Sequence, residues 1–201
     1  MKYYQEIFIY PDAETPRHAL REKVFELLHL AFVTSEKQLQ GQGVQVESIR
    51  FGLSFPNYHK GLFELDYTIR IFAPEKVDLE ILDLKTKLLK VKDYLKIGHI
   101  LNTPETNEFL CFKRKQVKSS LERRARRGTA RGVYPNQEVA MTELKKKGKQ
   151  VSKLPYIFVN STSSGNNRLR LFIDKNTSDT NIEGKFTSYG LSKKGSTVPD
   201  F

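Results

Sequence analysis

The stretch Lys113–Arg131, KRKQVKSSLERRARRGTAR, divides this chain into two parts of different character. It contains nine Lys or Arg residues and one acidic residue, Glu122, so its net charge of +8 leaves only +3 of the chain's total of +11. Residues 1–112 hold 14 basic and 16 acidic residues, whereas residues 113–201 hold 20 basic and 7 acidic residues. A near-neutral half followed by a strongly basic half predicts a scaffold joined to a surface that binds a polyanion.

Residues 120–131 are expected to form a helix with its positive charge on one side. The face opposite the arginines offers Leu121, Ala125 and Thr129, which is little apolar surface for a core. A solvated helix usually intersperses acids at i,i+4 spacing, so this helix favours phosphate groups, which guanidinium groups bind well. Gly128 is expected to interrupt the helix and let its second turn fray until nucleic acid orders it. At about 100° per residue, five arginines fall within an arc of about 160°: Arg123, Arg124, Arg126, Arg127 and Arg131.

The near-neutral half has the element order β-α-β-β-α-β, which is that of the ferredoxin-like fold. The pattern predicts strands at Lys2–Tyr10, Gln45–Phe55, Glu64–Phe72 and Tyr94–Leu101, helices over Pro16–Val33 and Pro74–Leu88, and a polar loop over 34–44. In the basic half it predicts a helix over Asn136–Lys149 and strands at Tyr156–Asn160, Arg168–Asp174 and Lys185–Leu191. We therefore predict an α+β protein. Its ferredoxin-like domain covers residues 1–107, and a smaller basic domain with the arginine-rich helix and a short antiparallel sheet covers residues 108–201.

The composition argues against several kinds of site and partner. A single cysteine, Cys111, leaves no internal disulfide and no cysteine-based zinc cluster. The sequence has no HExxH pair and no Gly-Lys-Ser phosphate loop, so an enzyme built from it is expected to need no metal and no other cofactor. No apolar run approaches the length of a membrane span, and the N-terminus lacks the features of a signal peptide. A cytoplasmic protein without a membrane partner is therefore expected.

His29 is the candidate for proton transfer. Counted from Leu20 along the first predicted helix, Val24, Leu27 and Ala31 lie within about 40° of that leucine, whereas His29 lies about 180° away. The side chain is therefore expected to face away from the scaffold. On spacing alone, an idle surface histidine is the favoured interpretation.

Several motifs occur in order along most of the chain. They are Leu27-Leu28-His29, Gly52-Leu53-Ser54-Phe55-Pro56, Arg114-Lys115-Gln116 before the arginine helix, a serine-rich loop before Arg170-Leu171-Phe172-Ile173, and Tyr189-Gly190-Leu191-Ser192 with Val198-Pro199. Together they resemble one family, the CRISPR-associated endoribonucleases of type I-F systems, which cut precursor CRISPR RNA within each repeat. The ordered set is specific, although each motif alone is weak.

The resemblance implies a role for each matching residue. The family's catalytic histidine matches His29, its catalytic serine matches Ser161 with Ser163 as the alternative, and the tyrosine that positions the histidine matches Tyr189. An aromatic residue that caps the terminal base pair in the family has no counterpart here, and Arg168 or Leu169 falls at its place. The implied RNA-binding residues, which read bases at the foot of the repeat hairpin or contact its stem, are Arg114, Gln116, Lys118, Arg123, Arg124, Arg126, Arg127, Arg131 and Arg168.

The implied reaction is attack by a ribose 2′-OH on the adjacent phosphate at the base of the repeat hairpin, leaving a cyclic phosphate and a 5′-OH. Because the nucleophile belongs to the substrate, the protein need only align it and move protons, for which one histidine suffices as base or acid. The resemblance also implies that the enzyme keeps its crRNA product as a monomer within the type I-F surveillance complex. A non-catalytic structured-RNA-binding protein would explain the charge division equally well.

Overall fold

A computed structural model describes residues 1–41, 48–58, 65–117, 121–146, 152–160 and 168–201. The chain forms two compact units. One contains Met1–Lys115 together with Leu154–Phe201, and the other contains Gln116–Lys153. The elements of the first unit are β1 (Tyr3–Ile9), α1 (Arg17–Gln40), β2 (Gly52–Ser54), β3 (Thr68–Ala73), α2 (Lys76–Leu82), α3 (Leu84–Lys87), the 3₁₀ helix η1 (Leu89–Tyr94), β4 (Leu95–Ile97), β5 (Leu101–Asn102), β6 (Phe109–Lys115), β7 (Tyr156–Val159), β8 (Leu169–Ser178) and β9 (Val198–Pro199). The second unit holds α4 (Leu121–Ala130) and α5 (Gln137–Lys146).

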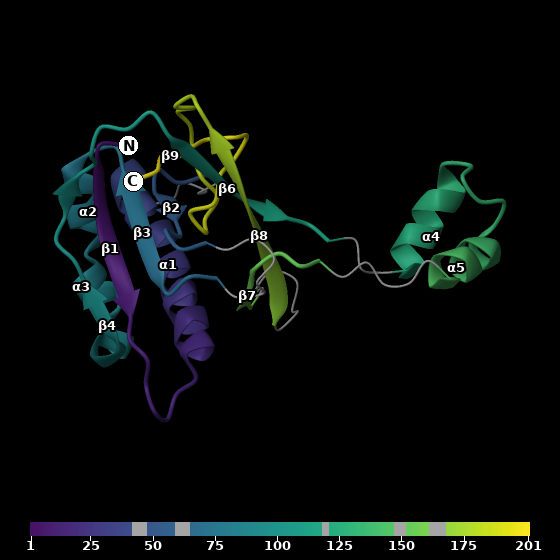
Figure 1. Cartoon of the computed structure of the whole chain (residues 1–201), viewed down its shortest axis with the longest axis horizontal. Helices are drawn as coiled ribbons and strands as arrows, with labels where there is room; N and C mark the ends of the chain where they lie inside the picture. The colour runs from purple at the N-terminus through teal and green to yellow at the C-terminus, as the bar shows by residue number, and fades with distance from the viewer. Residues whose placement is uncertain (42–47, 59–64, 118–120, 147–151, 161–167) are drawn as a thin grey trace. The chain divides into compact units, whose positions relative to one another are not determined.

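The first sheet has the strand order β2-β3-β1-β4, with β5 also paired to β1 (Figure 1). Its neighbouring strands are antiparallel. Successive residues of β1 point to opposite faces, so Ile7 is fully buried while Phe8 is 38% exposed. On the face that carries Phe8, the Arg70 guanidinium contacts the Glu6 carboxylate at 2.8 Å and donates to the Phe201 carbonyl at 2.9 Å. These contacts bring the two ends of the chain together, as Figure 1 shows.

A second antiparallel sheet has the order β7-β8-β6-β9. Its middle strand, β8, places Phe172 opposite Lys115 of β6 on one side and opposite Tyr156 of β7 on the other. The chain therefore leaves this sheet and returns to it at the same level, two strand spacings or about 10 Å apart. The second unit is thus inserted between β6 and β7, which lie on either side of Phe172 in β8.

Helix α1 is buried on more than one face. Leu20, Val24 and Leu28 are buried along one stripe, as the spacing predicts, but Phe25 and Phe32 are also buried. Phe25 stacks on the Tyr189 ring with the ring centroids 5.7 Å apart, so α1 packs against the C-terminal segment as well as the first sheet. Because α1 is buried on two faces, residues of the first sheet and of the C-terminal segment both contact this helix.

One hydrophobic core joins both sheets. Leu110, Phe112 and Ile173 of the second sheet belong to the same buried cluster as Ile7 and Val24. The second sheet therefore belongs to the same compact unit as the first sheet, and this division of the chain differs from the predicted boundary at residue 107. The physical reason is that β6 and β8 each carry apolar side chains that the short sheet alone would leave exposed.

Several predicted elements differ from the structure. The first helix does not end at Val33 but continues to Gln40, because Glu36 is buried and its carboxylate accepts from Gln40 at 2.5 Å and from the Arg50 guanidinium at 3.3 Å. The strand predicted at Lys185–Leu191 is a turn, with isolated bridges from Phe186 to Ile49 and to Ser192. The helix predicted over Pro74–Leu88 is divided at Asp83 into α2 and α3, and the strand predicted at Tyr94–Leu101 is divided into β4 and β5. The structure confirms the α+β class with antiparallel sheets.

The second unit is a pair of helices with its own small core. Ala125, Ala140 and Leu144 are buried, and Leu121, Tyr134 and Met141 pack against them. Gly128 does not end α4. A Cβ on Gly128 would lie 2.6 Å from the Tyr134 ring, so the glycine provides the space in which this ring covers the helix. Gly128 therefore has a packing role within α4.

Candidate active site and basic helix

A tight turn carries the first part of the site. The Gly190 N–H donates to the Thr187 carbonyl at 2.8 Å, and the Thr187 N–H donates to the Leu191 carbonyl at 2.7 Å. Gly190 has a φ of +71°, which a glycine adopts with little strain. A further bond from the Leu53 N–H to the Gly190 carbonyl at 2.9 Å fixes the turn to β2. Ser188 and Tyr189 therefore form the rigid middle of the turn, next to α1.

This turn holds the His29 ring by two contacts. The imidazole Nδ1 lies 2.9 Å from the Ser188 carbonyl oxygen. The ring stacks on Tyr189 with the centroids 4.3 Å apart and the planes at 18°. Because Phe25 stacks on the same tyrosine, three rings form one stack, and such pairs contribute about 0.5–1.5 kcal/mol each. His29 is therefore half-buried and held in one orientation by these two contacts.

Tyr189 is expected to remain a neutral phenol. Burial raises the pKa of Tyr189 above its ordinary value of 10, and the positive charge of Arg114 opposes the increase. A phenol that holds its proton more firmly than usual is poorly suited to exchange it near neutral pH. The contact between Tyr189 and His29 in the structure is ring stacking.

His29 and Tyr189 line a cavity of about 280 Å³ in the first unit. Its two walls come from α1 and from the β7–β8 region. Of the predicted RNA-binding residues, Arg168 also lines it. Sequence reasoning missed the rest of the lining, which is Ala19, Glu22, Lys23, Glu26, Phe158, Val159 and Asn160.

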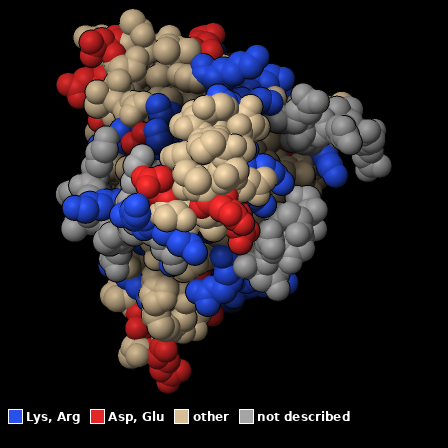
Figure 2. Space-filling model, turned by 90° about the vertical axis from the view of Figure 1, so that its right-hand side faces the viewer, with Lys and Arg blue, Asp and Glu red and all other residues tan. Residues whose placement is uncertain are grey.

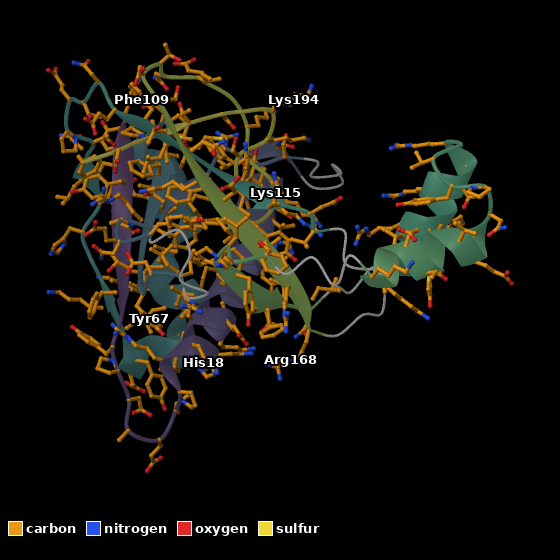
Figure 3. All side chains as sticks on the ribbon, turned by 45° about the vertical axis from the view of Figure 1, so that its right-hand side comes forward. His18, Tyr67, Phe109, Lys115, Arg168 and Lys194 are labelled. Atoms are coloured by element: carbon orange, nitrogen blue, oxygen red, sulfur yellow. The ribbon has the colours of Figure 1, made fainter. Side chains whose placement is uncertain are left out.

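Arg168 reaches the cavity in a defined conformation. Its φ of +61° is uncommon for a residue with a side chain, and its N–H donates to the Asn160 side-chain oxygen at 3.2 Å. The guanidinium lies over the Phe158 ring, 4.6 Å from its centroid. Figure 3 labels Arg168, which directly precedes β8, and His18 in the first turn of α1. An arginine and an aromatic ring therefore meet beside the candidate histidine.

The second unit carries the arginine-rich helix. The side chains of Arg123, Arg126, Arg127 and Arg131 are exposed, and Arg124 is half-buried. The buried Nη1 atom of Arg124 has no hydrogen-bond partner among the described residues. Figure 2 shows Lys and Arg side chains at the surface on the side that it presents. A helix with exposed guanidiniums on one side and Ala125 on the other can offer its charge to a polyanion while it packs on α5.

The other predicted site residues fall in different places. Arg114 lies at the end of β6 with its side chain exposed, and Gln116 follows in the second unit, also exposed. Ser161, Ser163 and Lys118 lie outside the described residues.

Two kinds of feature are absent from the described part of the chain. There, no group of three or more His, Cys, Asp and Glu side chains is arranged to hold a metal ion. Over the same residues, no helix combines the length and apolar character needed to cross a membrane.

Comparison with known proteins places the chain in a class. It is 33% identical over 202 residues to the CRISPR-associated endonuclease Cas6/Csy4 of Pseudomonas aeruginosa (strain UCBPP-PA14), covering 100% of both chains. It is 29% identical to the CRISPR-associated endonuclease Cas6/Csy4 of Escherichia coli (strain UTI89 / UPEC), again over 100% of both. These relatives are CRISPR-associated endonucleases.

The family follows from a match over nearly the whole sequence. Residues 4–201 match the family of the CRISPR-associated protein Cas_Csy4. The chain belongs to this family. A solved structure of a CRISPR associated protein Cas6 aligns over 98% of each chain, with 10% identity and a TM-score of 0.37.

Proposed function

We propose that this protein is a metal-independent endoribonuclease that cleaves precursor CRISPR RNA at the base of the repeat hairpin. The observation that carries the proposal is the placement of His29, whose ring is fixed against Tyr189 and the Ser188 carbonyl at the edge of a cavity. Membership in the Cas_Csy4 family and the named endonuclease relatives support the same activity.

The contact with Ser188 supports Nε2 as the nitrogen of His29 that acts on the substrate. A carbonyl oxygen can only accept a hydrogen bond, so Nδ1 carries a hydrogen in both the neutral and the charged imidazole. Nε2 is then the nitrogen whose protonation changes. In the neutral ring its lone pair is free, and we assign it the role of general base toward the substrate.

The chemistry proposed for the substrate needs no nucleophile from the protein. The ribose 2′-OH loses its proton to Nε2 of His29 and attacks the adjacent phosphorus, the bond to the following 5′-oxygen breaks, and that oxygen takes a proton from water. The products are a cyclic phosphate and a 5′-OH. Ser161, or Ser163 in its place, is retained as the predicted serine of this site. Arg168 lines the same cavity and can offset negative charge on the phosphate.

The two units are proposed to share one RNA hairpin. Arg114 and Gln116 read bases at the foot of the stem, and the exposed arginines of α4 contact its phosphates. Cleavage at the stem foot leaves those phosphates untouched, so the product stays bound. We propose that the protein, as a monomer with its crRNA, becomes a subunit of the type I-F surveillance complex in the cytoplasm.

We also assign the first sheet and its helices to the ferredoxin-like arrangement. The order β2-β3-β1-β4 with antiparallel neighbours is the one that a β-α-β-β-α-β chain forms in that fold. In place of a basic domain that begins at residue 108, we propose that the RNA-binding domain is the inserted unit Gln116–Lys153.

Substitution of His29 tests the reaction. His29→Ala should lower the cleavage rate about 10²–10⁴-fold, the usual cost of removing a general base, and should leave hairpin affinity close to wild type. His18→Ala is the matched control, because His18 is an exposed histidine on the same helix. His29→Asn keeps a donor for the Ser188 carbonyl but lacks a base, so it should be as slow as His29→Ala.

The assay follows cleavage of the cognate repeat hairpin in excess chelator. A hairpin with 2′-deoxyribose at the cleavage nucleotide should bind and remain intact. Cleavage of that substrate, or a wild-type rate for His29→Ala, would refute the mechanism. Tight binding without any cleavage by the wild type would favour the non-catalytic RNA-binding alternative.

A further inference from the structure

We infer that the cavity beside His29 is a specificity subsite for the first nucleotide 3′ of the cut, and that Glu22 selects guanine there. The inference rests on the proposed hairpin cleavage and adds to it a base preference outside the stem. It is carried by the shape of the cavity, by the aromatic and arginine side chains on one wall and by the carboxylate on the other.

The α1 wall of the cavity starts at the candidate base and runs toward the beginning of the helix. Ala19, Glu22, Lys23, Glu26 and His29 recur at spacings of three and four, so they share one face. Ten residues separate the ends of this series, or about 15 Å along the helix axis. A chain whose scissile phosphate lies at His29 therefore has a path for its next nucleotide along this wall.

The size of the cavity suits one nucleotide. Its volume of about 280 Å³ is at the lower end of sites for small molecules, and a duplex would not enter it. In the proposed reaction the nucleotide before the cut belongs to the stem. The nucleotide that can occupy the cavity next to His29 is therefore the unpaired one after the cut, which leaves with the 5′-OH.

The opposite wall offers a stacking surface. Phe158 is half-buried, and the Arg168 guanidinium lies over its ring at 4.6 Å. The hydrogen bond from the Arg168 N–H to Asn160 holds this arginine at the cavity. Unpaired bases commonly stack on aromatic rings and on guanidinium planes. This wall accepts any base and supplies affinity without sequence preference.

The Glu22 carboxylate on α1 supplies the preference for guanine. Glu26 is paired with Lys23 at 2.9 Å, whereas half-buried Glu22 makes no hydrogen bond to a described residue. An ionised carboxylate only accepts hydrogen bonds, so it repels phosphate and selects donors on a base edge. Guanine presents N1–H and N2–H side by side, which match the two oxygens of one carboxylate. Uracil presents one N–H between two acceptors and fits least.

Binding measurements test the subsite without requiring catalysis. Cognate hairpins blocked by 2′-deoxyribose at the cleavage nucleotide are prepared with a blunt end or with one 3′-nucleotide, G, A, C or U, and their Kd values are measured by fluorescence anisotropy. The guanine overhang should tighten binding by about 5- to 100-fold over the blunt hairpin, the range that base stacking and bidentate contacts give. A 5′-guanine overhang should give no gain.

Two variants test the contributions of the two cavity walls separately. Glu22→Gln should remove the advantage of guanine over uracil, and Phe158→Ala should weaken binding of all four overhangs while leaving the blunt hairpin unchanged. Glu14→Gln, which changes an exposed carboxylate in the loop before α1, is the matched control and should retain the guanine preference.

The outcomes distinguish the subsite from the proposed reaction. Equal affinity for the blunt hairpin and all overhangs, or a guanine preference that survives Glu22→Gln, would overturn the subsite even if the enzyme cleaves its hairpin. A guanine preference that depends on Glu22 would support the subsite even if the ribose-bearing hairpin were not cut, and that second result would count against the proposed function alone.

Discussion

Replacing Gly190 by alanine tests whether the turn that carries Ser188 and Tyr189 positions His29. A Cβ at this residue would lie 2.5 Å from Cγ of Leu53 and 3.2 Å from Cε2 of Phe32, and both of those side chains are buried. The φ of +71° adds a second cost, because side-chain-bearing residues rarely adopt it. The variant must therefore strain the turn and displace the core beneath it.

The magnitude follows from these two costs. A left-handed conformation costs about 1–2 kcal/mol for a residue with a Cβ, and overpacking of a core costs about 1–3 kcal/mol. Gly190→Ala should thus lower the free energy of unfolding by about 2–5 kcal/mol. Gly195→Ala is the matched control. Gly195 has a φ of +92°, but a Cβ there would meet nothing within 4 Å, so this variant should lose only about 1–2 kcal/mol.

Urea denaturation followed by circular dichroism measures the stability difference, and cleavage is assayed under conditions in which both variants are folded. Because a shift of about 1 Å at a catalytic group can cost about 10²-fold in rate, Gly190→Ala should cleave far more slowly than Gly195→Ala. A Gly190→Ala protein within about 0.5 kcal/mol of the control, with an equal cleavage rate, would refute the reasoning.

Two further predictions concern alkaline stability and RNA binding. Burial, assisted by Asp174, raises the pKa of Tyr58 to about 12, so stability present below pH 10 should fall by about 3 kcal/mol as pH rises through 12. Tyr58→Phe loses the hydrogen bond to the Ile173 carbonyl, which costs about 1 kcal/mol of stability at pH 8, but it has no phenol to ionise at high pH. Urea titrations should therefore show Tyr58→Phe as more stable than the wild type at pH 12. Parallel curves of stability against pH for the two proteins would contradict this. The double variant Arg126→Ala/Arg127→Ala should reduce the slope of log affinity for the hairpin against log salt concentration by about 0.7–0.9 per lost phosphate contact. The control variant Lys145→Ala/Lys146→Ala on α5 should keep the wild-type slope. A wild-type slope for the arginine variant would exclude the two arginines from the interface.

The apolar spacing of the first helix was sufficient to predict where α1 begins and which stripe it buries. Its end could not be predicted, because Ser35 and Glu36 are polar and resemble a loop in the sequence. Glu36 is stabilised by Arg50, which also contacts Asp78 at 3.1 Å. Such a contact links residues far apart in the chain, and no local pattern reports it.

The site was accessible to sequence reasoning only in part. The apolar stripe predicted only that His29 faces outward from its helix, and the roles of His29 and Tyr189 came from the family resemblance. The contact from Ser188 is made by its backbone carbonyl, which no residue type in the sequence could indicate. The aromatic residues around Phe186 favoured a strand, whereas the structure has a turn. Gly190 after Tyr189 was the one local sign of that turn. Phe158 and Glu22 could not be grouped with His29, because their proximity depends on α1 packing against β7.

The position at which the second unit is inserted makes that unit easy to exchange. Because Lys115 and Tyr156 face the same residue of β8, the two ends of the insertion are only about 10 Å apart. A short linker could close that gap without moving a strand or the His29–Tyr189 stack. If the protein has the proposed function, the inserted unit can be replaced by one that binds a different hairpin while the residues around His29 keep their positions.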